Sequence, residues 1–113
     1  MTIEKQGRRG RIEPFAMHDI ARGADGVLRF TSLAQSLVHM LRSSVDRDPH
    51  GEAIVVVGGE RLTFTELWSR AARVAGGLRS AGVRQGDHVA IHLPNGVPWV
   101  LAFFGCQLAG AVA

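Results

Sequence analysis

Two histidines have a spacing that could hold a metal ion, because His88 and His92 are four residues apart. On a helix this spacing places both imidazoles on one face, where a third ligand can complete a zinc site. Here Val89, Ile91 and Leu93 alternate with more polar residues, which indicates an extended chain in which four residues span about 13 Å. The two imidazoles are then too far apart to share one ion. We expect them on the less buried face of a strand, without a metal.

Phosphate and thiol chemistry have one candidate each. The dipeptide Gly58-Gly59 could cradle a phosphate, but no helix start and no Lys-Ser/Thr pair follows it. A short turn between two extended runs is the better interpretation. Cys106 is the sole cysteine, so no internal disulfide can form, and we expect a cytoplasmic protein. The residues themselves therefore predict no catalytic, cofactor-binding or metal-binding position.

A cluster of arginines near the N-terminus could form a basic arm for nucleic acid or a membrane surface. Arg8, Arg9 and Arg11 lack interleaved aromatic residues, so we prefer a solvated tail and expect no specific nucleic acid partner. This segment also lacks the apolar core of a signal peptide. Residues 1–30 are predicted to be a basic, mostly irregular extension, with a short strand at residues 27–30.

The remainder of the chain carries the pattern of a small globular domain. The sequence of 113 residues is 46% hydrophobic and 20% charged, which excludes disorder throughout. An amphipathic helix is predicted from Thr31 or Ser32 to Asp48-Pro49, with one apolar face. That face is formed by Leu33, Leu37, Met40, Leu41 and Val45.

Residues 52–62 and the residues after them predict a hairpin followed by a helix. The β-branched run at residues 52–57 meets Gly58-Gly59 and then a second extended run. Thr63 precedes Glu66 by three residues, which is the pattern of a capping box. A helix should start there and end at Gly82. Its buried face is predicted to hold Leu67, Trp68, Ala71, Ala75 and Leu78.

A strand over residues 86–93, a second helix from about Pro98 to Ala109 and a new strand at residues 111–113 are predicted next. This alternation of strands and helices is the pattern of a βαβ arrangement and of an α/β fold. The apolar residues 97–113 approach the length of a membrane span. Because Pro98 opens the helix and Gly110 ends it, we predict no transmembrane segment. The alternative is a small membrane-anchored or arginine-arm binding protein without catalysis.

Several stretches together resemble the opening of the AMP-forming acyl-CoA synthetases, in order and spacing. These enzymes are similar to fatty-acid-CoA ligases and belong to the acyl-activating, AMP-binding superfamily. The resemblance covers residues 31–113. It is carried by Leu62-Thr63-Phe64-Thr65-Glu66-Leu67, Gly82-Val83, Gly86-Asp87-His88-Val89-Ala90-Ile91, Leu93-Pro94-Asn95 and Leu108-Ala109-Gly110-Ala111-Val112-Ala113.

The resemblance implies an α/β fold in which residues 31–113 form a truncated, incomplete βαβ portion of the large N-terminal domain of an adenylate-forming enzyme. It implies ATP-dependent activation of a carboxylic acid, including fatty acids, through acyl-AMP, followed by thioester formation with CoA and assisted by Mg²⁺. The family's phosphate loop and its C-terminal lysine lie beyond residue 113. We therefore expect the chain alone to be inactive, to bind none of ATP, Mg²⁺ or CoA, and to self-associate through exposed strand edges.

Overall fold

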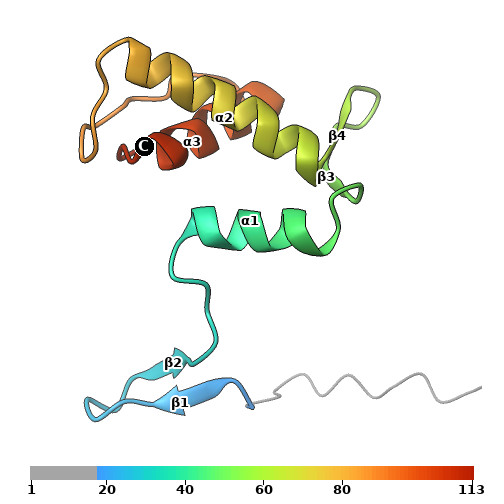
Figure 1. The fold of residues 1–113 in the computed structure, drawn as a ribbon. Helices are drawn as coiled ribbons and strands as arrows, with labels where there is room; N and C mark the ends of the chain where they lie inside the picture. Colours follow the sequence, from blue (N-terminus) through green and yellow to red (C-terminus); the bar gives the residue numbers. More distant parts are fainter. Residues whose placement is uncertain (1–17) are drawn as a thin grey trace, which may run out of the picture. The chain divides into compact units, whose positions relative to one another are not determined.

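The computed structural model describes residues 18–113, which fall into two units with a boundary between Leu33 and Ala34 (Figure 1). Arg8, Arg9 and Arg11 lie outside the described residues. The predicted division into residues 1–30 and 31–113 stays a prediction. The first unit contains strands β1 (Ile20–Arg22) and β2 (Leu28–Phe30). The second contains α1 (Leu37–Arg47), β3 (Glu52–Val55), β4 (Arg61–Thr63), α2 (Phe64–Ser80) and α3 (Val97–Ala109).

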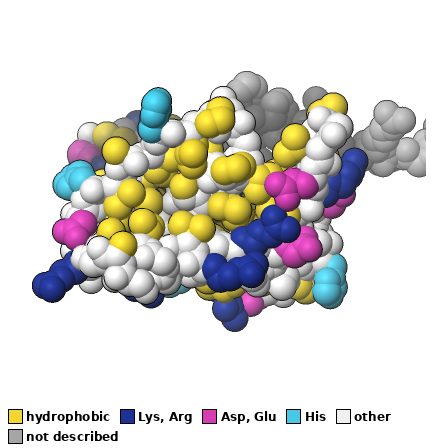
Figure 2. Space-filling view, turned by 90° about the horizontal axis from the view of Figure 1, so that it is seen from above, with side chains coloured by type: hydrophobic (Ala, Val, Ile, Leu, Met, Phe, Trp, Pro, Cys, Tyr) yellow, Lys and Arg dark blue, Asp and Glu magenta, His cyan; other side chains and the backbone are white. Residues whose placement is uncertain are grey.

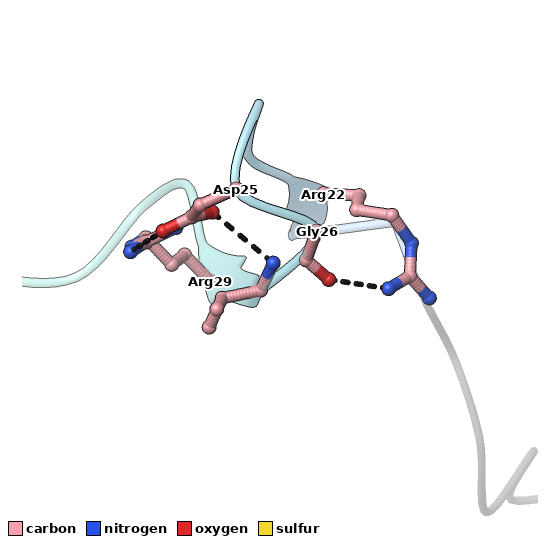
Figure 3. A network of polar contacts seen from close by, with 5 residues as sticks. Arg22, Asp25, Gly26 and Arg29 are labelled. Carbon is pink, nitrogen blue, oxygen red and sulfur yellow. Dashed lines mark hydrogen bonds and ion pairs between the residues drawn. The ribbon is translucent and has the colours of Figure 1, made fainter.

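Strands β1 and β2 form an antiparallel hairpin in which Ile20 pairs with Phe30. At its tip the Asp25 carboxylate accepts two hydrogen bonds from Arg29, of 2.8 and 2.6 Å (Figure 3). The Arg29 guanidinium lowers the pKa of Asp25 to about 2. Strand β2 confirms the extended run predicted at residues 27–30, whereas β1 was not predicted. Both strands are short and largely exposed, so no buried apolar face marks β1 in the sequence.

Helix α1 starts later than its apolar pattern predicted. Ser36 is the N-cap, and its hydroxyl oxygen accepts a hydrogen bond from the His39 backbone N–H at 3.2 Å. The predicted start at Thr31 or Ser32 is wrong, because the pattern was extended to Leu33, whose side chain is 71% exposed. The predicted end is confirmed, since Asp48 is the C-cap.

Strands β3 and β4 form the predicted hairpin, with Ile54 opposite Leu62. Gly58 has a φ of +72°, which the turn requires, and the Gly59 N–H donates to the Val56 carbonyl oxygen at 2.9 Å. Strand β3 ends at Val55, two residues earlier than the β-branched run suggested. Leu62 is 1% exposed and anchors the hairpin in the core.

Helix α2 begins at the predicted capping box. The Glu66 N–H donates to Thr63 Oγ1 at 3.2 Å, and the Thr63 N–H donates to Glu66 Oε2 at 2.9 Å. The Thr63 hydroxyl also donates to Glu66 Oε2, at 3.1 Å, and the bonds from the Thr63 N–H and hydroxyl to this carboxylate lower the pKa of Glu66. The helix buries Leu67, Ala71 and Ala75 of the predicted face, whereas Trp68 and Leu78 are only half-buried. After the helix, Gly82 takes a φ of +97°, as predicted.

The predicted strand at residues 86–93 does not form a ladder. It makes a single parallel bridge, between His88 and Val112. The Val89 N–H donates to the Val112 carbonyl oxygen and the Val112 N–H donates to the Asp87 carbonyl oxygen, both at 2.8 Å. A strand needs several consecutive pairs, and these two segments share only one, so neither the predicted strand at residues 86–93 nor the one at residues 111–113 forms. The parallel bridge nevertheless joins the two segments that flank α3, as the predicted βαβ arrangement requires.

Helix α3 occupies the predicted residues, from Val97 with Pro98 in its first turn to Ala109. Gly110 ends it with a φ of 80°. Within residues 18–113, no helix is long and apolar enough to cross a membrane. The fold of this unit is α/β, with one small hairpin, β3–β4, beside three helices.

Helices α2 and α3 lie side by side and make the largest contact in the second unit (Figure 1). A Cβ atom on Gly105 would lie 2.5 Å from Val74 Cγ1, so only glycine allows this approach of the helices. The Arg79 Nη2 atom donates to the Leu108 carbonyl oxygen at 2.6 Å and so caps the last turn of α3. The buried hydrophobic residues are Leu41, Leu62, Leu67, Ala71, Ala75, Val97, Cys106, Ala109 and Ala111.

Candidate functional site

An apolar groove of about 240 Å³ lies between α2, α3 and the chain segment that connects them. Helix α2 contributes side chains from its C-terminal half, and α3 contributes two residues one turn apart. The connecting segment runs along the groove with five consecutive residues. The lining residues are Val74, Leu78, Val89, Ala90, Ile91, His92, Leu93, Ala102 and Cys106.

The surroundings of the groove are also apolar. Trp99 and Phe103 stack on α3 with ring centroids 5.3 Å apart, and both rings are half-buried. Figure 2 shows hydrophobic side chains gathered over the middle of one face, bordered on one side by arginine and acidic side chains. A helix that is apolar on all sides, as α3 is, normally has cover on all sides. The groove and the exposed part of α3 beside it therefore have the character of a surface that packs against other apolar residues.

Two groups in the groove could in principle take part in chemistry, and neither is prepared for it. Cys106 is 1% exposed, and burial raises the pKa of its thiol. The protonated thiol is a poor nucleophile and a poor metal ligand. His92 is exposed, and no carboxylate lines the groove to orient its imidazole. The groove can bury apolar atoms but offers no acid-base pair.

No metal centre forms among residues 18–113, where no group of three or more histidine, cysteine or acidic side chains could hold an ion. His88 and His92 are both exposed, while Val89 and Ile91 between them are partly buried. This alternation is the one expected for an extended segment. Mg²⁺ prefers several oxygen ligands, which the described residues do not bring together.

A nucleoside triphosphate does not fit the starts of α2 and α3. Phosphates bind where free N–H groups and the positive end of a helix meet. At the start of α2 this position is taken by the negative Glu66 carboxylate. At the start of α3, Pro98 lacks an N–H group. The Gly58 turn leads into β4 rather than a helix, so it is not a phosphate-binding helix start either.

The sequence thus predicted the β3–β4 hairpin, α2 and α3, but not β1, the start of α1 or the groove. Gly105 lies inside the apolar helix predicted from Pro98 to Ala109, and the sequence did not indicate that it sets the distance between α2 and α3. Arg79 and Val74 were not singled out, because their partners are far away in the sequence. The signal that could have revealed the close approach is the small-residue spacing of Ala71 and Ala75 facing Gly105.

Comparison with known proteins gives a family match over most of the second unit. The model of the family described as "AMP-binding enzyme" matches residues 41–113. The feruloyl-CoA synthase of Amycolatopsis sp is 52% identical over 64 residues, which are 57% of this chain and 13% of that protein. Triostin synthetase I of Streptomyces triostinicus is 41% identical over 81 residues, covering 71% of this chain and 15% of that protein.

Solved structures agree with the sequence relatives. A fatty acid AMP ligase from Legionella pneumophila matches 70% of this chain with a TM-score of 0.62 and 31% identity, and the match covers 15% of that ligase. A Mycobacterium tuberculosis fatty acyl CoA synthetase matches 66% of this chain with a TM-score of 0.62 and 33% identity, again over 15% of the larger protein. The chain thus spans a small part of the length of the proteins that it resembles.

Proposed function

This chain belongs to the AMP-binding enzyme family, and we propose that it forms the N-terminal part of an AMP-forming acid–thiol ligase. The proposed activity of the complete enzyme is ATP-dependent activation of a carboxylic acid as acyl-AMP, followed by transfer of the acyl group to CoA. The family match over residues 41–113 is the observation that carries this proposal. The agreement of Legionella and Mycobacterium structures at 31% and 33% identity supports it.

The described residues would supply the scaffold of such an enzyme and not its chemistry. Two observations among the described residues support this: the Glu66 carboxylate occupies the start of α2, and no three histidine, cysteine or acidic side chains gather in one place. We therefore assign no catalytic step to residues 18–113. In this proposal the pair of helices α2 and α3 is a structural support. The apolar groove beside the pair is the surface against which the rest of an AMP-binding domain packs.

The proposed location is the cytoplasm, where ATP and CoA are available. Cys106 is free and buried, which fits a reducing compartment but does not require one. The acid that would be activated includes fatty acids as a class. No lining residue of the groove selects one acid over another, since eight of its nine side chains are apolar or carry only a thiol.

A chimera of the Amycolatopsis feruloyl-CoA synthase tests the proposal directly. The aligned segment of that enzyme, 52% identical over 64 residues, is replaced by the corresponding residues of this chain. If the segment is a family scaffold, the chimera should still form feruloyl-CoA from ferulate, ATP and CoA.

The matched control is the same chimera with Gly105→Leu, which should lose both its stability and its activity because α2 and α3 cannot approach. A chimera that folds with the melting temperature of the parent enzyme but forms no product would contradict the proposal. Two measurements on the same samples separate these outcomes. Chromatography measures product formation, and thermal unfolding measures stability.

A further inference from the structure

We draw no further inference here: the strongest candidate, the apolar face of the β1–β2 hairpin on which Ile20 pairs with Phe30 beside the exposed Leu28, carries none because nothing among residues 18–113 shows what covers it.

Discussion

The two halves of helix α2 differ in how completely their surroundings are closed. At the N-terminal half, the capping box satisfies the first turn, and Leu62 beneath it is 1% exposed. At the C-terminal half, a groove of about 240 Å³ remains beside Val74 and Leu78, and Leu93 is 43% exposed. The first region is built from residues close in sequence. The second depends on segments that are distant in sequence, which is where an AMP-binding domain would add further chain.

The largest expected effect is the loss of stability when a leucine side chain in the closed region, beneath the N-terminal half of α2, is shortened. Leu62→Ala should lower the free energy of unfolding by about 2–5 kcal/mol, because it removes buried methyl groups and leaves a cavity. Leu93→Ala, on the open side, should cost far less, since its side chain is 43% exposed. Urea unfolding at one fixed protein concentration measures both. Equal losses would show that the two regions are not different in packing.

A methyl group at Gly105 should be the next largest change. Gly105→Ala would place a Cβ atom 2.5 Å from Val74 Cγ1. The cost is expected to be about 1–3 kcal/mol, as for other overpacked cores. Gly76→Ala is the matched control, because a Cβ atom there meets nothing within 4 Å. That control should stabilise α2 by about 1 kcal/mol. A neutral Gly105→Ala would mean that the helices are not in close contact.

Removal of the cap should have a smaller effect. Thr63→Ala should cost about 1 kcal/mol, because the Glu66 N–H loses its acceptor. Thr65 is not a suitable control, because its Oγ1 donates to the Pro49 carbonyl oxygen at 2.9 Å. Ser69 is exposed on the same helix and is the better comparison. Melting temperatures of Thr63→Ala and Ser69→Ala that coincide would show that the cap contributes nothing.

The smallest expected effect is the pH dependence of the cap. The pKa of Glu66 is lowered in the folded chain by its bonds from Thr63. The stabilisation that the ionised Glu66 side chain gives to the fold is therefore present above the ordinary glutamate pKa. It is lost as the pH falls through the lowered pKa. The difference in melting temperature between wild type and Glu66→Gln should shrink as the pH is lowered below that range. A difference that grows on acidification would contradict this assignment.

Much of the fold could be predicted because its signals are local. The capping box at Thr63, the turn at Gly58 and the helix ends at Gly82 and Gly110 each depend on a few adjacent residues. The start of α1 was misplaced because the apolar periodicity continues past Ser36, and only the hydrogen bond to the His39 N–H shows where the helix begins.

The groove and the single bridge could not be predicted in the same way. Whether residues 86–93 form a strand depends on neighbours in space, and Val112 supplies only one pair. The approach of Gly105 to Val74 likewise joins residues of different helices. The candidates His88, His92 and Cys106 were assigned no role from the sequence, and among the described residues the groove holds no acid-base pair or metal cluster.

The central claim is that this chain supplies the scaffold of an AMP-binding enzyme without its chemistry. ATP–pyrophosphate exchange by the purified chain of 113 residues tests it most directly, with ferulate and a fatty acid as carboxylate substrates and the Amycolatopsis feruloyl-CoA synthase as positive control for ferulate. We predict no exchange above the rate without protein. Exchange that needs the carboxylate and is abolished by Leu62→Ala would show that these residues hold a complete adenylation site, and would contradict the account.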